Sequence, residues 1–182
     1  MPNDSSSELL NVRPVFTGRV IQVNVETVRL PNGNVADLDM IHHPGGAAVA
    51  AIDDENNICL LRQFRHAANG WLWELPAGKI DNREPPIETA HRELEEEAGK
   101  KAAHWQSLGE YCSSPGVFDE VVHLFLATGL NAVDINQEEH EVIEIHWKPL
   151  HEAIRMAHNG EIRDGKSIVG IFRAAMTLNA IK

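Results

Sequence analysis

Residues 78–99 read GKIDNREPPIETAHRELEEEAG and form the most informative stretch of the chain. Prolines at positions 85 and 86 suit the first turn of a helix, and Gly99 suits the position just after the last turn. The spacing therefore predicts a helix over residues 87–98. Successive helical residues are rotated by about 100°, which places four apolar residues on one stripe that would face a core. These residues are Ile87, Ala90, Leu94 and Ala98.

The same helix carries acidic residues on a second face. Glu93, Glu96 and Glu97 are spaced i, i+3 and i+4 and project from one arc, whereas Glu95 points away from it. Like charges at this spacing repel one another unless a cation joins them, and carboxylate oxygens are ligands that Mg²⁺ prefers. The alternative, for the helix taken alone, is a solvated charged face softened by an Arg92–Glu96 pair.

On both sides of this helix the chain has the patterns of strands. Upstream, strands are predicted at residues 19–30, 35–42, 47–52, 58–64 and 71–75, with a tight turn at residues 31–34 (PNGN). Downstream, strands are predicted at residues 121–127 and 142–147, and helices at residues 150–158 and 167–180. Strands that surround one central helix indicate a layered α/β (α+β) domain rather than a helical bundle or a β-sandwich.

Composition narrows the class of protein. A chain of 182 residues suits one domain with a sizeable core, and its net charge of −11 argues against non-specific nucleic-acid binding. The longest apolar stretch, residues 47–52, is too short to cross a bilayer, and the polar start lacks the features of a secretory signal. Cys59 and Cys112 form no disulfide framework. We expect a cytoplasmic protein without nucleic-acid or membrane partners.

Residues 78–99 resemble the signature of the Nudix hydrolase family. That signature is a Gly, five residues, a Glu, seven residues, then Arg-Glu, an apolar residue, any residue, Glu-Glu, any residue, Gly and an apolar residue. The matching polar and glycine positions are Gly78, Glu84, Arg92, Glu93, Glu96, Glu97 and Gly99. Lys100 departs from the final apolar position. The resemblance implies a Nudix α-β-α sandwich, a mixed β-sheet between helices, with a β-rich N-terminal arm.

The resemblance also implies a chemistry. Nudix enzymes use Mg²⁺ or Mn²⁺ to hydrolyse a nucleoside diphosphate linked to another moiety, because bound cations neutralise the diphosphate and acidify a water molecule. By position, the metal ligands would be the Ala77 carbonyl, Glu93, Glu96 and Glu97. Glu96 would act directly or through water and is also a candidate catalytic residue. Structural roles would fall to Gly78, Glu84, Arg92 and Gly99, with Arg92 orienting a carboxylate.

Further motifs resemble the ADP-ribose pyrophosphatase subgroup, and the resemblance extends over residues 44–147. The motifs are LLRQFR (60–65), WLWELPAGKID (71–81) and SPGVFDE (114–120). In that subgroup Arg65 would contact substrate phosphate, with Arg62 as its rival, since a guanidinium binds phosphate in a bidentate way. Glu120, next to Asp119, would be the general base or would position the attacking water. The alternatives are a surface arginine at a strand end and an exposed strand edge that begins with two acids.

The N-terminal part resembles the subgroup less closely. We expect residues 1–43 to form a β arm that joins two chains in a homodimer, and residues 44–182 to form the Nudix domain; an edge hairpin of a monomer is the alternative. The subgroup stacks adenine on aromatic residues of the arm, yet Phe16 is the one aromatic residue among the first fifty. This difference bears on the choice of base more than on diphosphate hydrolysis.

The resemblance therefore predicts Mg²⁺-dependent hydrolysis of ADP-ribose to AMP and ribose 5-phosphate. GDP-mannose or another nucleoside-diphosphate sugar is the alternative substrate, and a non-catalytic module that senses a nucleotide sugar is the alternative of another class. Residues 160–167 (GEIRDGKS) also fit the P-loop pattern G-x4-G-K followed by Ser or Thr. A P-loop follows a strand, whereas here a predicted helix precedes it, and Glu161 and Asp164 would repel phosphate. We interpret this segment as a loop between two helices.

Overall fold

The structure is a computed structural model that describes residues 6–136 and 142–181 of the chain. It divides into two compact units, one made of residues up to 44 with residues 112–120, the other of residues 45–111 with residues from 121 onward. Two long paired strands, β8 (Lys100–Ser114) and β9 (Phe118–Ala132), contribute residues to both units. Each unit is described separately below.

The first unit is an antiparallel meander. β1 (Glu8–Thr17), β2 (Gln22–Arg29) and β3 (Val35–His42) pair in chain order. The predicted turn between β2 and β3 is confirmed, since Gly33 has a φ of 84° and donates its N–H to the Leu30 carbonyl. β1 is not predicted from the sequence, because apolar and polar residues alternate only over residues 10–13 before Pro14, and all its residues are exposed.

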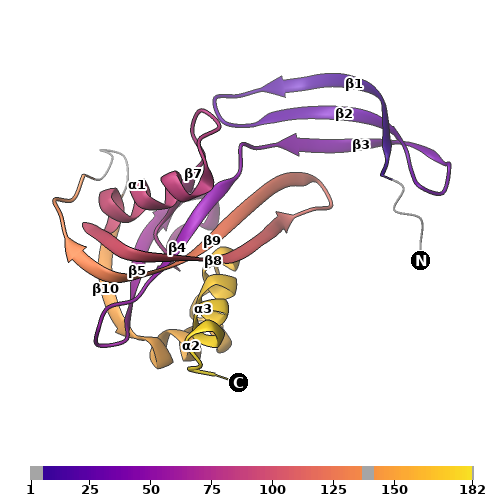
Figure 1. The fold of residues 1–182 in the computed structure, drawn as a ribbon. Coiled ribbons are helices and arrows are strands. Elements are labelled where there is room, and N and C mark those ends of the chain that lie inside the picture. The colour runs from indigo at the N-terminus through magenta and orange to yellow at the C-terminus, as the bar shows by residue number, and fades with distance from the viewer. Residues whose placement is uncertain (1–5, 137–141, 182) are drawn as a thin grey trace. The chain divides into compact units, whose positions relative to one another are not determined.

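The second unit has an α/β/α arrangement. β4 (Gly46–Ala51) lies between antiparallel β7 (Ala77–Lys79) and parallel β9, and β5 (Asn57–Arg65) lies between antiparallel β10 (Ile143–Pro149) and β6 (Gly70–Glu74). A short 3-10 helix (His66–Ala68) precedes β6. Figure 1 shows α1 (Pro86–Ala98) on one side of β4, and α2 (Leu150–His158) and α3 (Gly165–Thr177) on the other.

β4 explains why helices cover both sides. Successive side chains of a strand point to opposite faces, and all six residues of β4 are buried. Ala47, Val49 and Ala51 join a core cluster with the apolar stripe of α1. Ala48 and Ala50 join a second cluster with residues of α2 and α3. The predicted α-β-α layering is therefore confirmed.

Most of the predicted elements lie within a few residues of the observed ones. α1 begins one residue before the predicted start, and Gly99 ends it in the left-handed conformation with a φ of 61°. α2 covers the predicted residues, and α3 begins two residues early and ends at Thr177. β7 and β8 are not predicted, because β7 is short and most residues of β8 are not buried. In the described part of the chain, no helix combines the length and the apolar character needed to cross a membrane.

Candidate active site

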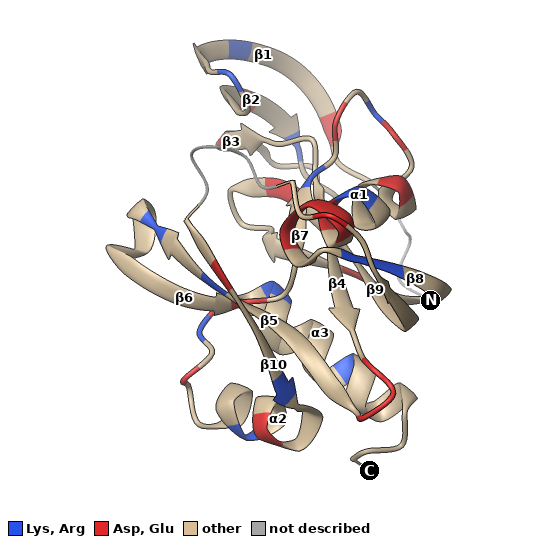
Figure 2. Ribbon diagram, turned by 90° about the vertical axis from the view of Figure 1, so that its left-hand side faces the viewer, with Lys and Arg blue, Asp and Glu red and all other residues tan. Residues whose placement is uncertain are grey.

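The apolar stripe of α1 fixes how the helix is rotated. Ala90 and Leu94 are fully buried against β4, so the arc that carries the signature glutamates turns toward β7. Figure 2 shows the acidic residues of α1, in red, next to β7. The helix therefore presents carboxylates to the strand that carries Ala77.

Glu97 is the most enclosed of the three signature glutamates. Its side chain is buried, with the residue 1% exposed, and its Oε2 accepts a hydrogen bond from the Ala77 N–H at 2.8 Å. Carboxylates are almost never fully buried unless they are paired. The hydrogen bond joins the helix to the residue whose carbonyl the Nudix pattern assigns to the metal.

Glu93 lies against the next residue of the same strand. A Cβ atom added at Gly78 would fall 1.8 Å from Glu93 Oε1 and 2.1 Å from its Cδ. Any side chain at position 78 would therefore collide with the carboxylate. The glycine that begins the signature is required here for close approach, a common reason for glycine beside a functional group.

Arg92 connects the acidic residues of the signature. Its Nη1 donates to Glu93 Oε1 at 2.6 Å and to Glu96 Oε2 at 3.3 Å, and its Nη2 donates to Glu84 Oε1 at 3.2 Å. Burial opposes the charge of the guanidinium, but the neighbouring carboxylates outweigh it and the pKa of Arg92 is raised. Arg92 therefore offsets the repulsion among the glutamates.

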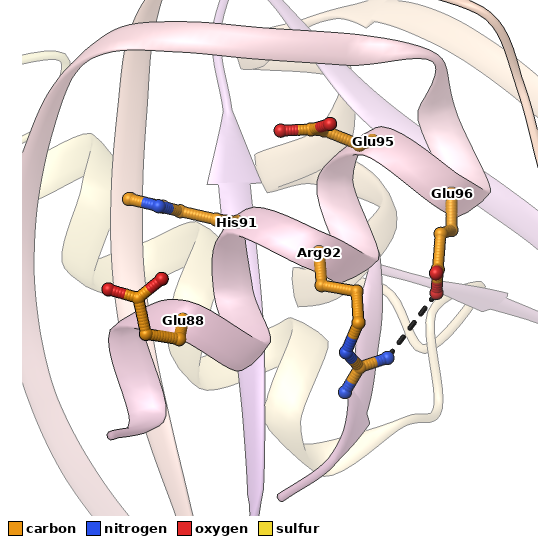
Figure 3. A pocket seen from close by; sticks show the side chains of 5 residues that line it. All are labelled: Glu88, His91, Arg92, Glu95 and Glu96. Carbon is orange, nitrogen blue, oxygen red and sulfur yellow. Dashed lines mark hydrogen bonds and ion pairs between the residues drawn. The ribbon is translucent and has the colours of Figure 1, made fainter. Parts of the chain in front are cut away.

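The outer face of α1 carries a separate shallow hollow of about 320 Å³. It is lined by Glu88, His91, Arg92, Glu95 and Glu96. Figure 3 shows Arg92 and Glu96 pointing toward one another, whereas His91 and Glu88 project from the other side of the helix. Glu93 and Glu97 do not line this hollow, so the two most buried signature carboxylates face β7 instead.

The donor set fits a hard divalent cation. Three carboxylates and a backbone carbonyl are oxygen ligands of the kind that Mg²⁺ and Mn²⁺ take, and two of the carboxylates lie directly against residues 77–78. Over residues 6–136 and 142–181, no three His, Cys, Asp or Glu side chains are gathered closely enough to hold a metal. The glutamates are held instead by Arg92 and by the Ala77 amide.

Arg65, the predicted phosphate contact, lies at the end of β5 and is held by Glu74. Its Nε and Nη2 donate to the two carboxylate oxygens of Glu74 at 2.8 and 2.9 Å. The Arg65 side chain is 40% exposed, and this pairing uses two of its three nitrogens. Arg62, its rival, forms an ion pair with Glu144 at 3.6 Å and lies over the Trp71 ring.

Glu74 makes the stability of the protein depend on pH. Burial disfavours its charge, but hydrogen bonds from Arg65 and the charge of Lys166 outweigh burial and lower the pKa of Glu74 from its usual 4.5 to about 2. A carboxyl with a depressed pKa stabilises the fold above its unfolded-state pKa, and this contribution is lost as pH falls toward the folded-state value.

We therefore expect the free energy of unfolding to fall by on the order of 3 kcal/mol through Glu74 alone between about pH 4.5 and 2. Urea denaturation at a series of pH values measures it. Glu74→Gln should have a shallower slope than wild type in this window, whereas Glu55→Gln, which removes an exposed carboxylate, should follow wild type. Equal slopes for Glu74→Gln and wild type would contradict the assignment.

Glu120 and Asp119 belong to the first unit, whereas Arg65, Ala77 and the signature glutamates belong to the second. Asp119 Oδ2 lies 2.5 Å from His42 Nδ1, and its Oδ1 accepts the His43 N–H at 2.8 Å. The hydrogen bond with Asp119 is the main reason why the pKa of His42 is raised. Glu120 Oε1 lies 3.4 Å from His43 Nδ1. Asp119 is thus engaged by two consecutive residues at the end of β3.

The P-loop pattern at residues 160–167 spans the connection between α2 and α3, as the sequence predicts. Asp164 is the N-cap of α3, and its side chain accepts the Ser167 N–H at 3.0 Å. A carboxylate therefore occupies the helix N-terminus at which a P-loop would hold phosphate.

Comparison with known proteins bears on the family. The model of the NUDIX domain matches residues 42–169. The ADP-ribose pyrophosphatase of Bacillus subtilis (strain 168) is 38% identical over 159 residues, which are 86% of this chain and 86% of that protein. The ADP-ribose pyrophosphatase of Mycobacterium tuberculosis (strain ATCC 25618 / H37Rv) is 38% identical over 167 residues, which are 90% of this chain and 81% of that protein.

A crystal structure of an ADP compounds hydrolase is similar in fold, with a TM-score of 0.83 over 99% of this chain and 98% of that chain at 20% identity. Three observations indicate the same family. They are the fold, the packing of the glutamate helix against Ala77 and Gly78, and the match over residues 42–169. The chain belongs to the Nudix family.

Proposed function

We propose that this protein is a Mg²⁺-dependent hydrolase that splits the diphosphate of ADP-ribose into AMP and ribose 5-phosphate. The observation that carries the proposal is the placement of Glu93 and Glu97 against Ala77 and Gly78, with every polar position of the signature present. The relatives named ADP-ribose pyrophosphatase support the choice of substrate. GDP-mannose or another nucleoside-diphosphate sugar is the alternative substrate.

Each residue has a distinct part in the proposed reaction. The Ala77 carbonyl, Glu93 and Glu97, with Glu96 directly or through water, would hold the cation. Bound Mg²⁺ supplies charge neutralisation and an acidified water, with Mn²⁺ as an alternative. Arg65 binds the diphosphate through the guanidinium edge that Glu74 leaves free of its bidentate pair. Glu120 accepts a proton from the attacking water, and Arg92 orients the glutamates.

Glu120 is favoured over Asp119 as the base, because both oxygens of Asp119 are held at 2.5 and 2.8 Å by His42 and the His43 N–H, whereas Glu120 has a longer contact of 3.4 Å with His43. We expect Glu120→Gln to lower kcat by about 100-fold with little change in KM, since an acidified water needs only part of the help that a base gives. AMP release at saturating ADP-ribose measures it. Glu110→Gln, which removes another carboxylate near a histidine, is the control and should match wild type. Wild-type kcat in Glu120→Gln would remove Glu120 from the reaction.

A substrate panel tests the proposed function. Purified protein is incubated with Mg²⁺ and, separately, ADP-ribose, GDP-mannose, NADH and nucleoside triphosphates, and the release of AMP or GMP is followed. We expect the highest kcat/KM with ADP-ribose, loss of turnover in EDTA and recovery when Mg²⁺ is restored. Preference for GDP-mannose would select the alternative substrate. Binding of ADP-ribose without turnover would identify a sensing module.

We also propose a homodimer joined through residues 1–43, with residues 44–182 as the hydrolase domain. The arm exposes large apolar side chains on β1, including Leu9, Val15 and Phe16, each more than half exposed. Exposed apolar clusters of this kind mark interaction surfaces. Sedimentation equilibrium at micromolar concentration should give twice the 20.2 kDa chain mass, and the chain mass itself would contradict the dimer.

A further inference from the structure

The P-loop-like residues contact the strand that leads into the active site. Lys166 Nζ lies 2.5 Å from Glu74 Oε2 and 3.0 Å from Asp164 Oδ2. The Ser167 hydroxyl donates to Asp164 and accepts the Leu75 N–H at 2.7 Å. Asp164, Lys166 and Ser167 are named the α3 clamp below. The clamp therefore joins the first turn of α3 to the end of β6.

The α3 clamp is enclosed and closely fitted. Ser167 is fully buried, and the Glu74 and Lys166 side chains are 3% and 16% exposed. One turn further along α3, a Cβ added at Gly170 would lie 2.6 Å from Leu75 Cδ1, so the helix backbone approaches the strand closely. Buried ionic groups need good geometry to offset their lost hydration, which leaves these groups little freedom to move.

The clamped segment connects the proposed phosphate ligand with the signature glutamates. Glu74 holds Arg65 through both carboxylate oxygens. The Pro76 carbonyl accepts the Val49 N–H at 2.9 Å, and the Ala77 N–H donates to Glu97. Residues 74–77 are thus bonded in turn to Arg65, α3, β4 and α1. A shift of Glu74 would therefore displace the Arg65 guanidinium, which is hydrogen-bonded to it directly.

Two cations share the Glu74 carboxylate. If Arg65 were its sole counter-ion, the full negative charge of Glu74 would be directed at the guanidinium and would compete with an incoming phosphate. Lys166 takes part of this charge, because its Nζ contacts Oε2, the same oxygen that accepts from Arg65 Nη2. The pKa of Glu74 stays low in this arrangement, so the carboxylate remains ionised at neutral pH.

We propose that Lys166 is a positioning residue for Arg65. Because Lys166 shares the Glu74 carboxylate, it orients the Arg65 guanidinium and leaves more of the positive charge of Arg65 available to bind the substrate diphosphate. The P-loop-like sequence would then serve diphosphate binding without touching phosphate itself. This inference rests on the proposed function, in which Arg65 contacts the substrate.

The first test compares steady-state kinetics of three variants with wild type. Lys166→Met keeps an unbranched side chain of nearly the same length but removes the charge, and should raise KM for ADP-ribose about 10-fold while kcat changes by less than about 3-fold. Lys166→Arg, which restores a cation, should stay within about 3-fold of wild type in both constants. Lys148→Met removes another lysine–glutamate pair of 2.8 Å in the same unit and should leave both constants unchanged.

The second test is a double-mutant cycle with Arg65→Met. If Lys166 acts through Arg65, adding Lys166→Met to Arg65→Met should raise KM no further. Additive effects on KM, or a wild-type KM in Lys166→Met, would overturn the proposal. Should Lys166→Met fail to fold, judged by far-ultraviolet circular dichroism, Lys166→Gln takes its place in both tests.

Calorimetric binding of ADP-ribose separates failure of this inference from failure of the proposed function. If wild type binds ADP-ribose but does not turn it over, the hydrolase proposal fails, and the same comparison is made on Kd. A Kd raised about 10-fold in Lys166→Met would then still support the positioning role. An unchanged Kd, or no binding by wild type, would overturn it.

Discussion

Glu97→Gln is expected to lower kcat by about 10³-fold with the fold retained. Glutamine has nearly the same shape, and its amide oxygen can still accept the Ala77 N–H, so α1 and β7 stay joined. The negative charge is lost, however, and each carboxylate at the proposed metal site helps to stabilise charge that develops in the transition state. Because Glu97 is the most buried of the signature acids, water does little to replace it.

AMP release from ADP-ribose measures this effect, together with a Mg²⁺ titration in which half-maximal activity should require more metal. Thermal melting in the absence of metal reports whether the fold is kept. Glu95→Gln is the matched control, because Glu95 lies on the same helix and pairs with Lys101 rather than with β7. Unchanged turnover in Glu97→Gln would exclude Glu97 from the metal site.

Gly78→Ala should also abolish most activity, by a steric route. The added Cβ would lie 1.8 Å from Glu93 Oε1, so the carboxylate must leave its place beside β7. The colliding atoms are the end of a side chain rather than backbone, and we therefore expect the fold to survive while kcat falls by about 100-fold or more.

Gly70→Ala is the matched control for Gly78→Ala, because Gly70 begins β6 and a Cβ added there meets no atom within 4 Å. Both variants are assayed for AMP release and for thermal melting. Gly70→Ala should behave as wild type in both measurements. If Gly78→Ala kept wild-type kcat, the position of Glu93 against β7 would not matter for the reaction.

Local sequence features were sufficient for α1 and for the layered class of the fold. The Pro-Pro start, the Gly99 end and the apolar stripe all act within a few residues of one another, and the short apolar runs of β4 and β5 are equally local. β1, β7 and β8 are not predictable in this way, because a very short strand, or one that is largely exposed, carries little periodic apolar signal.

In the candidate site, too, some features could be predicted from the sequence and others depend on the tertiary structure. The glutamates, Gly78 and Arg92 could be predicted because the signature holds them at constant spacing along one helix and its approach. The collision that explains Gly78 could not, because it depends on how closely α1 packs against β7. Asp119 and His42 are separated by 77 residues, and their pairing likewise follows from the approach of β9 to β3.

Glu74 and Lys166 show most clearly which contacts the sequence alone does not predict. The charged residue within the apolar run WLWEL was a visible signal that Glu74 needs a partner, since a buried carboxylate must be paired. Its partners, however, come from β5 and from the first turn of α3, the latter 92 residues away. Periodicity and spacing express interactions between near neighbours in the chain, and so they were sufficient to predict the helix and its two faces. Which cations meet the buried carboxylate depended on the packing of distant elements around β6, and that packing is a property of the folded chain as a whole.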